Sequence, residues 1–282
     1  MIRLDAATVL LQWATGGLFF LWVTTRRREV GIGYGWLLRG VYGTMAAGAL
    51  IAGDLLRPDT GRDVCSVLTT AAAAGALALS VVRRKAGVAG ERERRARVAA
   101  RLPASTLAVE AGDEAGRAEF PPAVDLLAPA AGAVGLVLAG AHSGGPEALA
   151  VIRTVLGAAF LGAVSDAMLL GHWYLVQPGL GRGPLLDLVR WTAWTWPFEV
   201  AALLWPPGMV RVLEGRIDDG WNGTLGWFWV ACAVTTIALC VVTRAALKER
   251  AYSAVMAATG LLYLAILTAF GTDLVARAVL RP

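Results

Sequence analysis

The chain has 282 residues, of which 57% are hydrophobic and only 17% charged, and its formal net charge is +5. A soluble domain of this length carries roughly 25% charged residues, so the deficit argues against an ordinary water-soluble globular protein. The mean hydropathy of +0.59 agrees with that exclusion. The basic residues flank apolar segments, so the positive charge gives no reason to expect nucleic-acid binding.

The apolar residues come in eight blocks, each about as long as a bilayer is thick, and most charges lie between the blocks. A spanning helix needs about 20 predominantly apolar residues. We therefore predict an all-α, polytopic transmembrane helical bundle that forms a single membrane domain, with the lipid bilayer as its first partner. The predicted spans are residues 6–25, 35–56, 64–82, 124–141, 148–176, 188–205, 225–243 and 251–272.

Charge placement predicts the orientation of the spans. Arg26, Arg27 and Arg28 follow the first block instead of preceding it, which is the opposite of a signal peptide. Basic residues are concentrated in the connections 26–34, 83–123, 177–187 and 244–250. The positive-inside rule then makes 83–123 a cytoplasmic linker and places both termini on the outer side.

The preference for arginine over lysine and the placement of the tryptophans indicate the source of the protein and its contact with lipid headgroups. Lys85 and Lys248 are the only lysines, and so heavy a preference for arginine is typical of a GC-rich bacterial genome. We therefore expect a multi-pass protein of the bacterial plasma (inner) membrane. Tryptophans near predicted span ends indicate aromatic belts at the headgroup level: Trp22, Trp36, Trp173, Trp191 and Trp194 inside, and Trp205, Trp221 and Trp227 outside.

Small residues recur at positions that favour close helix packing. Ala131 and Gly135 lie four residues apart in the fourth predicted span, and Ala158 and Gly162 in the fifth. This spacing places two small residues on one helix face, where a second helix can approach closely.

Ionisable groups at membrane depth are costly and mark candidate functional sites. Asp166 lies about ten residues before the inner end of the fifth span, and Glu199 about eleven residues after the inner start of the sixth. At 1.5 Å per residue, both are expected roughly 15 Å from the inner surface. Two facing carboxylates would share a proton or hold a cation. His172, six residues from Asp166, would pass protons to the cytoplasm.

The inner ends of the same two spans suggest a second site. Pro197 breaks the backbone hydrogen-bond ladder two residues before Glu199, and a kink there would line a cavity. The predicted inner-interface pocket, which would contact a quinone or another cofactor, consists of Trp173, Tyr174, Arg190, Trp194 and Pro197.

Other polar residues are expected to be structural. Arg39 and Arg153 lie near span ends, from which their side chains can reach the headgroups. His142 and His172 are predicted near opposite membrane faces, which disfavours a bis-histidine haem. No metal-ligand spacing occurs, and the cofactor stays unknown.

Three functions are compatible with this pattern: proton- or cation-linked transport through Asp166 and Glu199, a cofactor-contacting subunit of a membrane redox complex, and a non-catalytic assembly protein among other membrane subunits. No phosphate-binding loop, dinucleotide fingerprint, zinc-protease motif or nucleophile elbow occurs, which favours a role other than catalysis.

Overall fold

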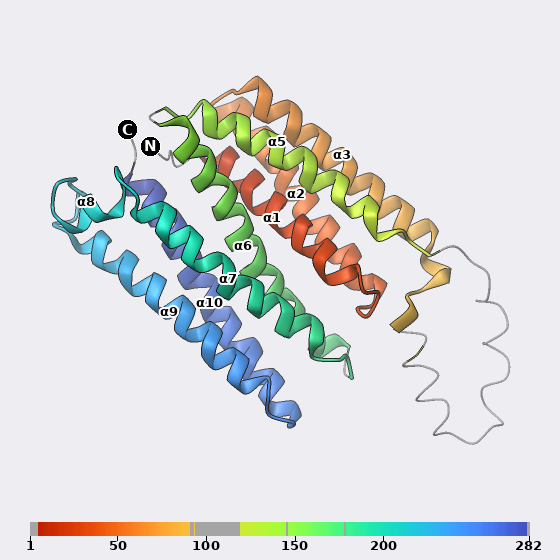
Figure 1. The fold of residues 1–282 in the computed structure, drawn as a ribbon. Coiled ribbons are helices and arrows are strands. Elements are labelled where there is room, and N and C mark those ends of the chain that lie inside the picture. Colours follow the sequence, from red (N-terminus) through yellow and green to blue (C-terminus); the bar gives the residue numbers. More distant parts are fainter. Residues whose placement is uncertain (1–4, 91–92, 94–118, 145, 178, 281–282) are drawn as a thin grey trace, which may run out of the picture.

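A computed structural model describes residues 5–90, 93, 119–144, 146–177 and 179–280, and these residues form helices and no strand (Figure 1). The all-α prediction is therefore confirmed. Most of the predicted linker 83–123 lies outside the described residues. Its described residues include the 3₁₀ turn Arg84–Ala86, helical residues at 89, 90 and 93, and the start of the 3₁₀ turn Pro122–Leu126.

The long helices follow the apolar blocks of the sequence. The α-helices are α1 (Ala6–Thr25), α2 (Ile32–Leu56), α3 (Thr60–Val82), α5 (Leu127–Ala141), α6 (Glu147–Val176), α7 (Gly183–Leu204), the short α8 (Met209–Leu213), α9 (Thr224–Ala246) and α10 (Tyr252–Val279).

Within the described part of the chain, six helices are long and apolar enough to cross a membrane: α1, α3, α5 with the 3₁₀ turn before it, α6, α9 and α10. This number marks the chain as a multi-pass membrane protein. The other two long helices are less apolar, because α2 carries Arg39 and Asp54, and α7 carries Asp187, Arg190 and Glu199.

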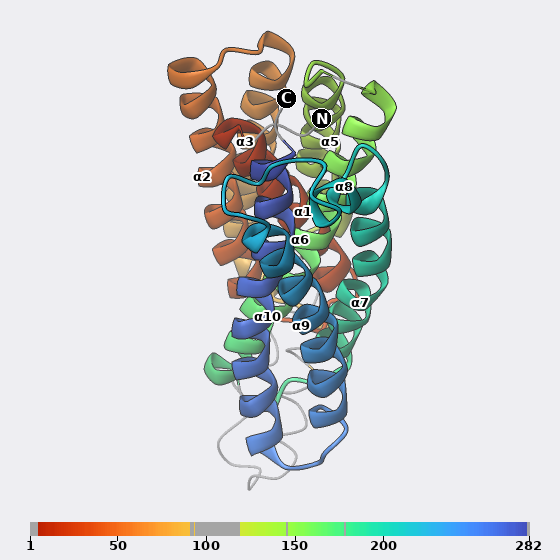
Figure 2. The same ribbon diagram turned by 90° about the vertical axis from the view of Figure 1, so that its left-hand side faces the viewer.

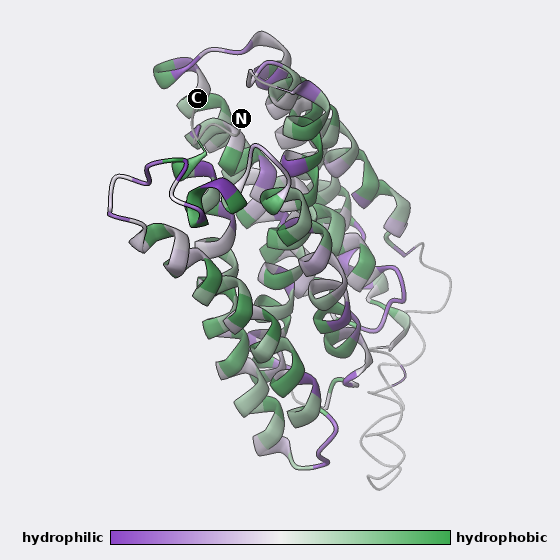
Figure 3. Cartoon of the chain, turned by 60° about the vertical axis from the view of Figure 1, so that its left-hand side comes forward, coloured by the Kyte–Doolittle hydropathy of each residue, from purple (hydrophilic) through white to green (hydrophobic). Residues whose placement is uncertain are grey.

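The long helices lie side by side, and α6 occupies the centre of the bundle (Figures 1 and 2). It packs against α1 and α5 on one side and against α7 and α10 on the other. Hydrophobic residues dominate along the helices, and hydrophilic residues concentrate in the connections (Figure 3). The start of α1 and the end of α10 lie at the same end of the bundle, which we call the terminal end (Figure 1).

The central helix approaches α1 at backbone contact distance. A Cβ atom built on Gly16 would lie 1.8 Å from the carbonyl oxygen of Ala158, and one built on Gly162 would lie 2.2 Å from the carbonyl carbon of Gly16. Gly135 is similarly close to Cys65 of α3, with its Cβ position 2.6 Å from that of Cys65. Three of the four small residues singled out in the sequence, Gly135, Ala158 and Gly162, thus lie where helices touch.

A single carboxylate organises the start of α9. Asp219 accepts hydrogen bonds from the backbone N–H groups of Trp221, Gly223 and Leu225, at 2.8 to 2.9 Å. Burial alone raises the pKa of Asp219, but these backbone donors outweigh it and hold the pKa below its ordinary value. Asp219 therefore stabilises the loop before α9 in its ionised form.

We expect Gly162→Val to destabilise the bundle, because the added side chain collides with the α1 backbone, and overpacking of this kind costs about 1–3 kcal/mol or more. Thermal unfolding in detergent, followed by circular dichroism, measures the loss. Gly260→Val on α10 is the control, since nothing lies within 4 Å of a Cβ at that position. Equal melting temperatures for both variants would contradict the packing described here.

The contribution of Asp219 to stability depends on pH. Because its folded pKa is lowered, the stabilisation is present above the unfolded pKa of about 4 and is lost as the pH falls through the folded pKa. The melting temperature of Asp219→Asn should therefore fall below that of the wild type at pH 7, and the gap should close on acidification. Asp218→Asn is the control, because within the described part of the chain Asp218 accepts a single hydrogen bond, from the Gly220 N–H. A gap that does not change with pH would refute the assignment.

Candidate functional site

Asp166 lies inside the bundle, bound to α2. Its side chain is fully buried, and the Tyr42 hydroxyl donates to Oδ1 at 2.6 Å. The Tyr34 hydroxyl donates to the Asp166 backbone carbonyl at 3.4 Å. The second carboxylate oxygen has no hydrogen-bond partner among the described residues. The partners of Asp166 thus come from α2 and not from α7.

Glu199 is also fully buried, but its surroundings are different. Neither of its carboxylate oxygens accepts from an N–H or hydroxyl donor of the described residues, and its side-chain hydrogen bond is to another carboxyl group, that of Asp273. The charged groups that act on it most strongly are Asp273 and Arg277 of α10 and Arg153 of α6. Glu199 therefore faces a second carboxyl group with two guanidinium groups nearby.

Asp273 connects this region to α1. The Arg277 Nε donates to Asp273 Oδ2 at 2.7 Å, and the Gln12 Nε2 donates to Oδ1 at 3.3 Å. The space for these side chains exists because α6 has Gly157 here, whose Cβ would lie 2.6 Å from Asp273 Oδ1. Side chains of α1, α6, α7 and α10 thus form one interior charge cluster, which consists of Gln12, Arg153, Glu199, Asp273 and Arg277.

Arg153 fixes the register of α6 against α7. Its guanidinium donates to the carbonyl oxygens of Ala202 at 2.9 Å, Trp205 at 2.7 Å and Pro207 at 3.0 Å. These carbonyls lie at or beyond the C-terminal end of α7, where helical hydrogen bonds are missing. The expectation that Arg153 reaches the headgroups is wrong, since only 1% of the residue is exposed.

This register corrects the predicted pairing of Asp166 with Glu199. Because Arg153 lies level with Ala202 and Asp273 touches the Gly157 position, Glu199 lies about level with Gly157. Nine residues separate Gly157 from Asp166 on α6, or roughly 13 Å. The predicted depths matched only because the sixth span was expected to begin at residue 188, whereas α7 begins at Gly183.

His172 lies towards the end of α6 that is remote from the terminal end. It is exposed, and its Nδ1 lies 3.2 Å from the Tyr263 hydroxyl of α10. Its predicted role as a proton relay stays a prediction, because six residues, roughly 9 Å of helix, separate it from Asp166. His142 is the C-cap of α5 and lies at the terminal end, whereas His172 lies towards the opposite end of the bundle. The structure therefore does not bring the two histidines together.

The residues of the predicted inner-interface pocket have separate surroundings. Trp173 donates to Gln177 at 2.8 Å, and the buried Tyr174 donates to the Gly181 carbonyl. Arg190 contacts Asp187 on the surface. Trp194 and Pro197 are exposed on α7. The structure therefore does not join these side chains into one site.

Two other buried arginines are fully paired. Arg39 donates through Nε and Nη2 to the two oxygens of Asp125, both at 2.7 Å, and its guanidinium lies 4.4 Å from the Phe120 ring centroid. Arg62 pairs with Asp5 and Asp63. The expectation that Arg39 reaches the headgroups is wrong, because the 3₁₀ turn before α5 brings Asp125 to it.

Sequence reasoning missed Asp273, Arg277 and Gln12. The predicted eighth span stopped at residue 272, but α10 continues to Val279 and buries both charged residues. The spacing of Asp273 and Arg277, four residues apart, is that of an ion pair on one helix face and could have revealed them. Gln12 carries no charge and gave no comparable signal.

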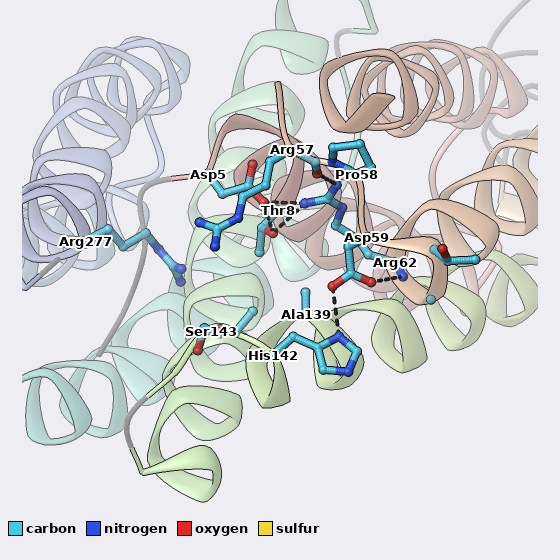
Figure 4. A pocket seen from close by; sticks show the side chains of 13 residues that line it. Asp5, Thr8, Arg57, Pro58, Asp59, Arg62, Ala139, His142, Ser143 and Arg277 are labelled. Carbon is cyan, nitrogen blue, oxygen red and sulfur yellow. Dashed lines mark hydrogen bonds and ion pairs between the residues drawn. The ribbon is translucent and has the colours of Figure 1, made fainter. Parts of the chain in front are cut away.

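A cavity of about 420 Å³ lies at the terminal end, next to the interior charge cluster (Figure 4). Arg277 belongs both to its wall and to the cluster. In the described residues, no group of three or more His, Cys, Asp or Glu side chains could hold a metal ion.

Comparison with known proteins adds no assignment. No protein-family model matches the chain, and no curated protein or solved structure matches it significantly. The functional inference therefore depends on the geometry alone.

The buried Arg39–Asp125 pair should be a stability element. Asp125→Ala would leave a buried guanidinium unpaired, at a cost of about 3–5 kcal/mol, and the double change Arg39→Met with Asp125→Leu should recover most of it. Thermal unfolding in detergent measures both variants. Asp187→Ala is the control, because its arginine partners are exposed and such pairs contribute below about 1 kcal/mol. An Asp125→Ala protein as stable as the control would refute this role.

Proposed function

We propose that this protein is a proton-linked membrane transporter whose proton-exchanging group is Glu199, with Asp273 beside it. The observation that carries the proposal is the surroundings of Glu199: a fully buried carboxyl group that accepts from no N–H or hydroxyl donor of the described residues and has a second carboxyl group, Asp273, as its side-chain hydrogen-bond partner. Two adjacent buried carboxylates cannot both stay ionised without a large cost, so a proton is shared between them.

A proton fits this site better than a metal cation. Arg153 and Arg277 act on the same carboxyl group, and their positive charges would repel a bound cation. Exchange of a proton needs only that the carboxyl group can gain and lose it. We therefore narrow the expectation of proton- or cation-linked transport to the proton.

The same observation argues against a purely structural role. A residue that only locks helices together would be paired, as Arg39 is with Asp125 and Arg62 is with Asp5. Glu199 is instead paired with another carboxyl group, Asp273, and that contact stabilises the fold only while a proton lies between the two. A role in assembly with other membrane subunits, and a role in a redox complex, stay predictions that no particular contact favours.

Asp166 and His172 are proposed as later groups on the proton's way to the opposite end of the bundle. Both lie on α6, in that order from the Glu199 level. The separation of roughly 13 Å between the Glu199 level and Asp166 exceeds hydrogen-bond reach, so transfer between them requires intervening water.

We also propose eight spans, with both termini on the outer side of a bacterial plasma membrane. Helices α2 and α7 have 25 and 22 residues, so each exceeds the roughly 30 Å of a hydrocarbon core. The excess of arginine in alternate connections supports the orientation. Exposed Trp205, Trp221 and Trp227 near the terminal end support an aromatic belt there.

Proton movement through the purified protein tests the proposal. In liposomes that enclose a pH-sensitive dye, an imposed potassium diffusion potential should drive proton uptake by the wild type. Glu199→Gln removes the exchangeable proton with little change in size, so uptake should fall to the leak of empty liposomes. Glu147→Gln is the matched control, because Glu147 is exposed in the first turn of α6. Wild-type uptake by Glu199→Gln, or no uptake by the wild type, would overturn the proposal.

A further inference from the structure

The cavity at the terminal end has the size and position of a ligand site. Its volume of about 420 Å³ lies within the usual range for small-molecule pockets. Its wall comes from the start of α1, the α2–α3 connection, the end of α5, α6 and the end of α10. Residues far apart in the sequence thus converge on one hollow (Figure 4).

The acidic residues of the wall are already paired. Asp5 accepts from the Thr8 hydroxyl at 2.7 Å and from Arg62. Asp59 accepts from the Arg62 backbone N–H at 3.1 Å and lies 2.9 Å from His142 Nδ1. Burial raises the pKa of Asp59, but these two contacts outweigh it and hold the pKa below its ordinary value. Neither carboxylate therefore needs a cationic ligand.

Two guanidinium groups of the wall keep free donors. Arg277 is only 1% exposed, its Nε is bound to Asp273, and its Nη2 has no hydrogen-bond partner among the described residues. Arg57 directs its guanidinium into the hollow (Figure 4), and no carboxylate of the described residues pairs with it there. A buried guanidinium with an unused N–H group is costly unless a ligand accepts from it.

The charge of the wall favours the same kind of ligand. Of its three arginines, Arg62 is paired with Asp5 and Asp63, and Arg277 is paired with Asp273, so Arg57 is the arginine of the wall that has no carboxylate partner among the described residues. Planar guanidinium groups match carboxylate and phosphate oxygens in geometry as well as in charge.

We propose that this cavity binds a small anion, a carboxylate or phosphate group held between Arg57 and Arg277. Since Arg277 also holds Asp273, the bound anion and the Glu199–Asp273 pair share one guanidinium. Binding itself is independent of proton transport, whereas the further statement that the anion is the transported substrate rests on the proposed function.

Titration of the full-length protein in phosphatidylcholine nanodiscs tests the site, with succinate and inorganic phosphate as probes, glycerol as the neutral comparison, and calorimetry as the readout. At least one anion should bind and glycerol should not. Arg57→Gln should weaken binding by about tenfold or more, the loss expected for a charge-assisted hydrogen bond. Because Arg57 is exposed, the Arg57→Gln variant should fold. Arg277 is buried, so the Arg277→Gln variant is a poorer test, since its loss of binding could come from misfolding.

Arg216→Gln is the matched control, since Arg216 is exposed and pairs with Glu214 outside the cavity. Nanodiscs that contain phosphatidylglycerol separate two sources of the anionic group. If a lipid headgroup is the natural occupant, those discs should abolish succinate and phosphate binding to the wild type, and the lipid should stay bound in native mass spectrometry unless Arg57 is replaced.

The inference is overturned if neither anion nor phosphatidylglycerol binds, or if Arg57→Gln binds them as the control does. Glu199→Gln separates this result from the proposed function. The Glu199→Gln variant should keep its affinity for the anion within about threefold of wild type, because Glu199 does not line the cavity. Removing a direct hydrogen bond to the anion would instead weaken binding by about tenfold. If Glu199→Gln loses proton uptake but keeps anion binding, both proposals stand. If the wild type takes up protons but binds no anion, only the anion site is removed.

Discussion

The crossing of α1 over α6 at Gly16 and Gly162 is the contact on which the interior of the protein depends. Without side chains at these positions the two backbones touch, and α6 can then pack on its other sides against α5, α7 and α10. One turn before the crossing, α1 places Gln12 against Asp273. Any larger residue at the crossing would separate the helices that together enclose the charge cluster.

Buried charges in this bundle are of two kinds. The pairs Arg39–Asp125 and Arg62–Asp5 are closed units in which each guanidinium finds a carboxylate, so they hold helices at fixed positions. In the interior charge cluster, by contrast, Glu199 has another carboxyl group, Asp273, as its partner, and Arg277 has an unused donor among the described residues. Groups left in this condition cost free energy, and such costs are typical of sites where a proton or ligand comes and goes.

Arg277 gives the cluster a physical connection to the outside of the bundle. Its Nε binds Asp273, and its side chain is also part of the wall of the cavity at the terminal end. An anion bound in the proposed site would contact the guanidinium group that also holds Asp273. The proposed ligand site and the proposed proton site therefore share one side chain, while their tests stay separate.

The sequence by itself determined the all-α class, the multi-pass membrane character and two carboxylates, Asp166 and Glu199, that are indeed fully buried. These are local properties, since the length and apolarity of a segment decide whether it can be a membrane helix. The small-residue positions 135 and 162 were also visible, because close packing requires them wherever the partner helix lies.

Only the tertiary structure decided which buried groups meet. The height of Glu199 relative to Asp166 depends on the bond between Arg153 and the Ala202 carbonyl, 49 positions away in the chain. The partners of Arg39 and of Asp166 come from 86 and 124 positions away. Helix register is set by such distant contacts, and the hydropathy pattern of a sequence does not predict them. For that reason the sequence identified the costly residues, whereas the fold alone assigned Glu199 to Asp273 and Asp166 to Tyr42.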